Sequence, residues 1–333
     1  MSLVDELIYI SEPISKFPEL VQGAGGNTSA KDTTGSMIIK ASGFRLSEMT
    51  GEKGNETVAL NGINEFLLSS EIKNNPDKEL KEFVSNKIVN PQGFLPSMET
   101  GFHAVLPHYV VHTHPIWLNV FSCAQNSKHK LDECLNEFEG YCFIPYKTPG
   151  FYLSKAIAEQ NNYSIYVLKN HGLITCSDSK EEAFDLTLRI NAYAKKVLGV
   201  SNTIAQPSIK YISDNVFESN TQGLPTMVLQ ALTVTDNLSK ILFPDQAVFL
   251  FNKVTISETL NSSKPVCIHP KTGTITYFET ENKAIALEEN IWALCNILHQ
   301  QQKQDLQPQF LSDTDCAYLL NMDMEKYRQQ LVK

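Results

Sequence analysis

The pattern of apolar and polar positions predicts short strands and amphipathic helices in the first half of the chain. Residues 1–20 suit an amphipathic helix that ends before Pro18, and a glycine-rich turn follows at 23–29. Strand-like runs then occupy residues 28–31 and 37–40. Residues 50–93 are polar and lysine-rich, with one strand at 57–60 and one helix at 78–87. Their composition favours a surface excursion.

The next stretch alternates more regularly between buried strands and helices. Ser97 is a suitable N-cap for a helix, which places Glu99 in its electropositive first turn. Further elements follow in the order strand 110–114, helix 116–124, strand 164–169 and helix 180–198, the last capped by Ser179. Strands and helices are mixed throughout, which indicates an α/β fold built in layers.

A polar, proline-containing stretch at 199–207 is the candidate boundary between two domains. It separates residues 1–200 from a smaller α+β region at 201–333. The expected elements of that region are a helix at 225–241, strands at 247–251 and 272–278, and helices at 282–301 and 312–331. The last two helices suit a role in packing or in oligomer contacts.

Composition narrows the class of protein. The chain has 333 residues and a formal net charge of −9, so nucleic acid and anionic membranes are not expected partners. Its 7 cysteines form no CxxC pair, which favours reduced thiols in the cytoplasm. The N-terminus carries Asp5 and Glu6 where a signal peptide needs positive charge, and no apolar run is long enough to cross a bilayer.

Three histidines form the candidate metal site. His112 and His114 are two residues apart on a predicted strand, so both imidazoles project from the same face. His171 follows another predicted strand and precedes Gly172, where the backbone can approach closely. Three imidazoles leave positions open for substrate oxygens, as in catalytic zinc sites. Simple packing of such histidines is the alternative.

The motifs around these histidines occur in a distinctive order. They are Gly26-Asn27-Thr28-Ser29, Ala41-Ser42-Gly43, Pro96-Ser97-Met98-Glu99, His112-Thr113-His114-Pro115 and Asn170-His171-Gly172. The series resembles the class II aldolase/adducin family, which includes fuculose-phosphate and rhamnulose-phosphate aldolases and ribulose-phosphate 4-epimerase. The resemblance covers about residues 5–200 and is nearest to the aldolase half of long rhamnulose-phosphate aldolase/dehydrogenase fusions. No GxGxxG follows a strand, so a dehydrogenase half is not expected.

The resemblance implies a three-layer α/β/α class II aldolase fold and a metal-dependent aldehyde-lyase. His112, His114 and His171 would bind Zn²⁺, with Mn²⁺ or Co²⁺ as substitutes. Glu99 would be the catalytic acid/base, although a carboxylate placed for the helix dipole is the alternative. The expected reaction cleaves a ketose phosphate into a dihydroxyacetone-phosphate-like ketone and an aldehyde. The resemblance also implies a homotetramer.

The family's phosphate cradle matches Asn27, Ser42, Gly43 and Ser97, for which ordinary turn chemistry is the alternative. Lys40 would add charge, but a lysine at a strand end is usually solvated. Met98 stands where fuculose-phosphate aldolase-like sequences carry a second serine. Residues 122–140 contain no tyrosine, so no catalytic tyrosine is assigned. His103 suits either a place beside the ligands or the core.

Three rival functions follow from the same residues. The metal site would also support an epimerase, a decarboxylase or a dehydratase. An adducin-like interaction module would have lost the metal ligands, and all three histidines are retained here. A regulator that binds metal and ligand without turnover is the third. His269 has no partner ligand at suitable spacing and is expected to be structural.

Overall fold

The computed structural model describes residues 2–71, 74–201 and 204–323. Its first part is built on a seven-stranded sheet. The elements of this part are α1 (Leu3–Ser15), β1 (Asn27–Lys31), β2 (Ser36–Lys40), a 3₁₀ turn η1 (Leu46–Glu48), β3 (Asn55–Ala59), α2 (Ile63–Leu68), α3 (Pro76–Ser85), α4 (Thr100–Val105), β4 (Tyr109–Thr113), α5 (Ile116–Ser122), α6 (Lys128–Cys134), β5 (Cys142–Ile144), α7 (Phe151–Ala158), β6 (Ile165–Leu168), β7 (Gly172–Ser177) and α8 (Lys180–Val197).

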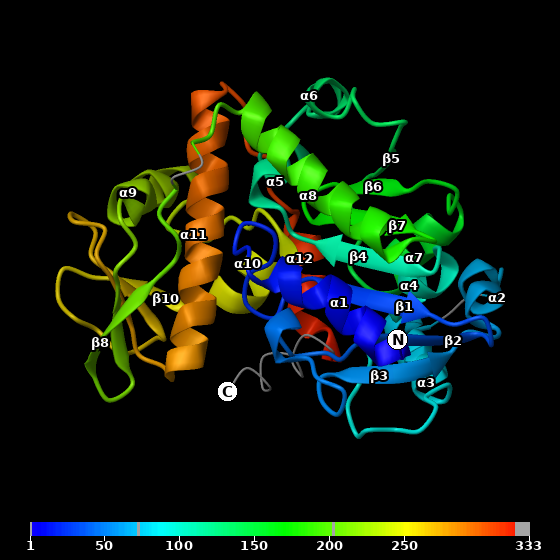
Figure 1. Ribbon diagram of the computed structural model, residues 1–333. Coiled ribbons are helices and arrows are strands. Elements are labelled where there is room, and N and C mark those ends of the chain that lie inside the picture. Colours follow the sequence, from blue (N-terminus) through cyan, green and yellow to red (C-terminus); the bar gives the residue numbers. More distant parts are fainter. Residues whose placement is uncertain (1, 72–73, 202–203, 324–333) are drawn as a thin grey trace.

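The sheet has the strand order β3-β2-β1-β4-β7-β6-β5, and only the β5–β6 pair is parallel. Helices α1 and α8 lie across one face of this sheet (Figure 1). Helices α2, α3, α4 and α7 pack together on the other face. The three-layer α/β/α arrangement predicted from the sequence is therefore present, although the sheet is mostly antiparallel.

Local signals explain the two long helices of the first layer. Ser2 opens α1 with a capping box, and the apolar face of α1 is fully buried through Leu7, Ile10 and Ile14. Ser179 caps α8 as expected, since its side chain accepts a hydrogen bond from the Glu182 amide (3.3 Å). Both helices follow the predicted 3.6-residue spacing of apolar positions.

The expectation of a surface excursion at residues 50–93 is wrong. Strand β3 is an edge strand of the main sheet, paired with β2. Leu67, Leu80 and Val84 from α2 and α3 are buried in the core on the second face of the sheet. The many polar residues are the solvent sides of these amphipathic elements, which composition alone does not distinguish from a loop.

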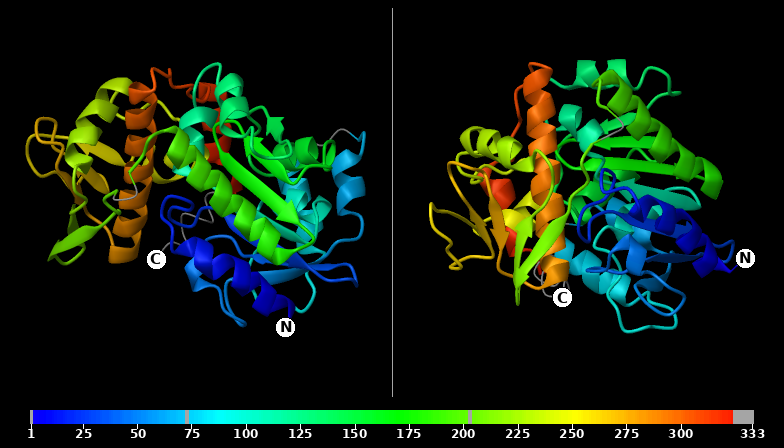
Figure 2. Two further views of the ribbon diagram at one scale, coloured as in Figure 1. Left: turned by 45° about the horizontal axis from the view of Figure 1, so that its top comes forward. Right: turned by 60° about the vertical axis from the view of Figure 1, so that its left-hand side comes forward.

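The second part surrounds a long helix, α11. Its elements are β8 (Ile209–Ser213), β9 (Val216–Ser219), α9 (Leu224–Val234), α10 (Pro244–Leu250), β10 (Val254–Ile256), β11 (Val266–Ile268), β12 (Ile275–Tyr277), α11 (Glu281–Lys303) and α12 (Asp313–Asn321). The strands form a second sheet in the order β10-β11-β12-β9-β8. Figure 2 shows α11 standing between this sheet and the first part of the molecule. The predicted α+β character of the region is present.

Two sequence predictions in this part need correction. The run predicted as a strand at 247–251 belongs to helix α10, because Pro244 at the first helical position starts a helix there. The helix expected at 225–241 ends at Val234, where Asp236, Asn237 and Leu238 adopt positive φ. Of the helix expected at 312–331, residues 324–331 lie outside the described residues.

One apolar core joins the two parts of the chain. It contains α5 side chains such as Trp117 and Val120, and α11 side chains such as Ile291 and Trp292. Helix α11 packs directly against α5, α9 and α10. In the described ranges 2–71, 74–201 and 204–323, no helix is both long and apolar enough to span a bilayer.

Candidate metal centre and surrounding cavity

His112 and His114 come from the central strand β4 and the residue just beyond its end. Strand alternation places both imidazoles on one face, with ring centroids 4.9 Å apart. The Nε2 atoms of the two rings are 3.1 Å apart. Nδ1 of His112 donates to the Leu173 carbonyl (3.0 Å), and Nδ1 of His114 donates to the Asp245 carboxylate (2.7 Å). The Nδ1 atoms are thus committed to acceptors, and the two Nε2 atoms are the ring nitrogens that face one another.

His171 enters the same space from the turn between β6 and β7. Asn170 makes this turn possible because it adopts φ +54°, a conformation that asparagine tolerates. Gly172 has no room for a side chain, since a Cβ there would collide with the Thr113 carbonyl of β4. The His171 ring centroid lies 4.9 Å from that of His112 and 5.1 Å from that of His114.

The three buried imidazoles fit a divalent cation. Each offers one nitrogen, and the three nitrogens lie within 4.8 Å of one another. Two nitrogens bound to one tetrahedral zinc lie about 3.3 Å apart, since each Zn–N bond is about 2.0–2.1 Å. Burial lowers the pKa of His112 to about 4, so this ring is neutral at physiological pH. A cation is a natural partner for imidazole nitrogens that converge in this way.

The carboxylate of Glu99 lies beside the three-histidine cluster. Its Oε2 lies 3.4 Å from His112 Nε2 and accepts a hydrogen bond from Asn27 Nδ2 (2.7 Å). Its Oε1 lies 3.7 Å from His171 Nε2. Among the described residues Oε1 has no hydrogen-bond partner, although it is buried. Both oxygens thus border the histidine cluster, and only Oε2 is held by a hydrogen bond among the described residues.

Ser97 does not cap α4 as the sequence suggested. The helix begins at Thr100, so Glu99 precedes the first turn and does not lie within it. The Ser97 side chain accepts a hydrogen bond from the Glu99 amide (3.2 Å). The predicted helix start is displaced because Ser97 caps the turn that leads into α4.

All four residues expected in the phosphate cradle line one cavity with Glu99, His114 and His171. These four are Asn27, Ser42, Gly43 and Ser97. The cavity has a volume of about 40 Å³, which accommodates water molecules but not a sugar phosphate. Met98, Pro149 and Pro244 also line it. Binding of a larger ligand therefore requires these apolar side chains to move apart.

His103 lies behind Asn27 and belongs to the hydrogen-bonded surroundings of Glu99. His103 is fully buried, and its ring contacts the Ser29 hydroxyl (2.7 Å) and the Asn27 side chain, which in turn holds Glu99. Burial shifts the pKa of His103 well below its ordinary value.

Met98 packs against an apolar cluster of the second part, formed by Ile241, Ala247, Leu319 and Met322. Met98, which stands where fuculose-phosphate aldolase-like sequences carry a serine, therefore contacts the second part of the chain.

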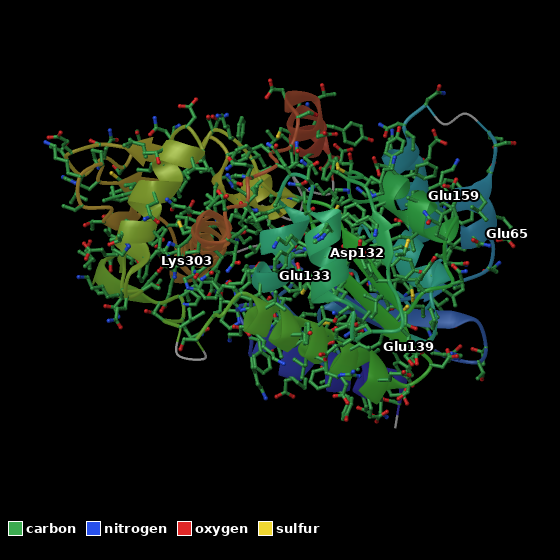
Figure 3. All side chains as sticks on the ribbon, turned by 90° about the horizontal axis from the view of Figure 1, so that it is seen from above. Glu65, Asp132, Glu133, Glu139, Glu159 and Lys303 are labelled. Carbon is green, nitrogen blue, oxygen red and sulfur yellow. The ribbon has the colours of Figure 1, made fainter. Side chains whose placement is uncertain are left out.

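Lys40 is a buried lysine in the cavity wall. It is 3% exposed, and its Nζ donates to the carbonyls of Phe44 (2.7 Å) and Ala24 (3.2 Å). The usual solvated state of a lysine at a strand end does not apply here. Five acidic residues of the first part that Figure 3 labels are exposed: Glu65, Asp132, Glu133, Glu139 and Glu159.

Asp245 is the site residue that the sequence analysis missed. It is 1% exposed and reaches His114 from α10, which lies 131 positions further along the chain. The sequence signal that could have located Asp245 was Pro244-Asp245, a typical helix start, in front of a run that was interpreted as a strand.

His269 lies far from this centre in sequence, in a turn where its Nδ1 accepts from the Lys271 and Thr272 amides.

Comparisons with known proteins point to one family. Residues 6–198 match the family described as Class II Aldolase and Adducin N-terminal domain. A stretch of 208 residues is 30% identical to the uncharacterized oxidoreductase YuxG of Bacillus subtilis (strain 168), covering 59% of this chain. The match spans only 29% of that longer protein, so its name says little about this chain.

Two solved structures illustrate the likeness. The N-terminal class II aldolase domain of a conserved protein from Thermoplasma acidophilum is 28% identical, with a TM-score of 0.52 over 59% of this chain and 94% of that one. The l-fuculose-1-phosphate aldolase from Thermus thermophilus is 16% identical, with a TM-score of 0.41 over 59% of this chain and 93% of that one. The family match ends at residue 198, so Asp245 lies beyond it.

Proposed function

The chain belongs to the class II aldolase and adducin N-terminal domain family, and from that premise we propose that it is a metal-dependent aldehyde-lyase. The substrate is a ketose phosphate, which is cleaved to a dihydroxyacetone-phosphate-like ketone and an aldehyde. The observation that carries the proposal is the cluster of three buried imidazoles, two of which, His114 and His171, line one cavity together with Glu99. An adducin-like interaction module has no use for this arrangement.

His112, His114 and His171 are the proposed ligands of a divalent ion, with zinc first and manganese or cobalt as substitutes. When bound, the ion supplies Lewis-acid stabilisation of the negative charge that develops on the substrate oxygens. The ring orientations of His112 and His114 support the assignment, because each Nδ1 proton is already committed to an acceptor.

Glu99 is the proposed acid/base. Asn27 holds Oε2, so Oε1 is the oxygen that exchanges a proton with the substrate. A carboxylate positioned in this way contributes typically a factor of about 10²–10⁴ to the rate. His103 contacts Asn27 and therefore supports the orientation of Glu99 from the side away from the cavity.

Asn27, Ser42, Gly43 and Ser97 are the proposed contacts of the substrate phosphate, and Lys40 compensates its charge. Small polar side chains and backbone amides at turns suit an anion. The local charge of Lys40 matters because the chain as a whole carries a formal net charge of −9. The proposed assembly is a homotetramer in the cytoplasm, and the seven free cysteines suit that compartment.

The test combines metal analysis with a screen of ketose phosphates for aldehyde release. We expect about one divalent ion per chain and release of an aldehyde from at least one substrate. His171→Ala should lose both the ion and the activity, whereas His129→Ala, on the exposed side of α6, should keep both. Aldehyde release that is equal in the wild type and His171→Ala would refute the proposal. Sedimentation of the same preparation measures the oligomeric state.

A further inference from the structure

We propose that Asp245 is a positioning residue of the metal site, contributed by the region that lies beyond the family match. The inference rests on the proposed assignment of His112, His114 and His171 as metal ligands. Asp245 acts through His114 and does not itself bind the metal. The family domain alone would therefore lack one part of this site.

The contact between Asp245 and His114 is close, buried and enclosed. Oδ2 of Asp245 lies 2.7 Å from His114 Nδ1, and the two side chains are 2% and 9% exposed. Gly25, in the glycine-rich turn, faces the pair. A Cβ at Gly25 would come within 2.5 Å of Asp245 Oδ2 and 3.0 Å of His114 Nδ1, so a side chain at this position would disturb the contact.

A carboxylate on the distal nitrogen of a ligand histidine has a defined effect. It fixes the tautomer with the proton on Nδ1, orients the ring, and makes Nε2 a stronger donor to the metal. Nε2 of His114 points to the shared space, 3.1 Å from Nε2 of His112. For His112 the same role falls to the Leu173 carbonyl of β7, which belongs to the family domain. The two rings thus depend on different parts of the chain.

Asp245 is not needed to hold the second part of the chain in place, because other contacts do so. Asn170 Nδ2, beside His171, donates to the Leu242 carbonyl (2.8 Å) just before α10. Glu289 of α11 accepts from the Gly23 amide (2.6 Å) and pairs with Arg45 (2.9 Å). Loss of the Asp245 carboxylate should therefore leave the two parts docked.

The test measures metal affinity by competition with a chelator, using Zn²⁺ on the metal-free chain of 333 residues. Asp245→Ala should weaken binding about 10–100-fold, the usual cost of losing such a partner. Asp245→Asn should weaken it less, since an amide oxygen still accepts the Nδ1 proton. With Co²⁺ in place of zinc, both variants should shift the visible ligand-field spectrum. Circular dichroism and the melting temperature of the metal-free proteins establish that each variant is folded.

Two matched controls separate positioning from general effects. Glu289→Gln removes charge from the contact between the two parts without touching a ligand. His108 and Asp178 make a histidine–aspartate contact of the same length, 2.7 Å, on the surface, where their side chains are 45% and 78% exposed. Asp178→Ala removes this carboxylate far from the proposed ligands. Both controls should bind Zn²⁺ like the wild type and leave the cobalt spectrum unchanged.

Three results would overturn the proposal. If the wild type binds Zn²⁺ and both Asp245 variants bind it equally well, the positioning role fails while the metal site stands. If Glu289→Gln weakens binding as much as Asp245→Ala, Asp245 acts only through docking of the second part. If the wild type itself does not bind Zn²⁺, both the metal site and this inference fail.

Discussion

At the scale of single residues, the arrangement around Glu99 separates its two carboxylate oxygens. Asn27 binds Oε2 at 2.7 Å, and the Asn27 side chain is itself held by His103. Oε1 remains buried without a hydrogen-bond partner among the described residues. A buried carboxylate oxygen without a hydrogen-bond partner costs stability, so its presence calls for an explanation such as a role in function. We therefore interpret Oε1 as the atom reserved for the substrate.

The corresponding prediction concerns Glu99→Gln. This substitution keeps the volume and one acceptor but removes the exchangeable proton. We expect the fold and the metal content to be retained while kcat falls about 10²–10⁴-fold. Lyase rate, metal content and melting temperature are measured on the same sample. A rate equal to that of the wild type would show that another group moves the proton, even if the protein proves to be an aldolase.

At the scale of elements, the sequence predicted the strands and helices that carry the histidines and missed the element that carries Asp245. Strand alternation placed His112 and His114 on one face without any knowledge of the fold. The short apolar run Ala247–Phe251 contains too few residues for its periodicity to distinguish a strand from a helix. Contact between Asp245 and His114 depends on the tertiary structure, which brings α10 close to the residue that follows β4, and no local pattern encodes it.

The end of strand β1 gives a second example of what only tertiary structure shows. Lys31 is 8% exposed, and its Nζ donates to the carbonyls of Leu106 and Pro107. Burial lowers the pKa of Lys31 from its ordinary 10.5 to about 7, and the negative charge of Asp178 opposes part of this shift. The strand pattern alone gave no indication that this ammonium group is withdrawn from water.

This burial predicts a pH dependence of the free energy of unfolding. Between pH 7 and 10.5 the unfolded chain binds a proton at Lys31 that the folded chain does not, so stability should rise with pH in this window. Lys31→Met should flatten the rise by about 1–3 kcal/mol, since the carbonyl contacts offset part of the burial. Urea unfolding of both proteins at pH 7 and 9.5 measures the difference. Parallel pH profiles would contradict the burial of a neutral amine.

At the scale of the whole molecule, the second part of the chain is integrated with the family domain. Met98 packs against the apolar cluster of the second part, Asp245 reaches His114, and Glu289 binds the glycine-rich turn. The main apolar core also contains side chains from both α5 and α11. A boundary at residues 199–207 therefore marks a change in topology, whereas the packing continues across it.

A shared core predicts that both parts unfold together. The chain has two tryptophans, Trp117 in α5 and Trp292 in α11, and both are buried in that core. In Trp292→Phe the remaining fluorescence reports on the family domain, and in Trp117→Phe it reports on the second part. In each variant we expect the fluorescence midpoint in urea to coincide with the midpoint from far-ultraviolet circular dichroism, as for a single cooperative transition. Each variant serves as its own reference, so a loss of stability from the substitution does not affect the comparison. If the fluorescence midpoint differs from the circular dichroism midpoint in either variant, the two parts unfold separately, and the site would then depend on docking between independent domains.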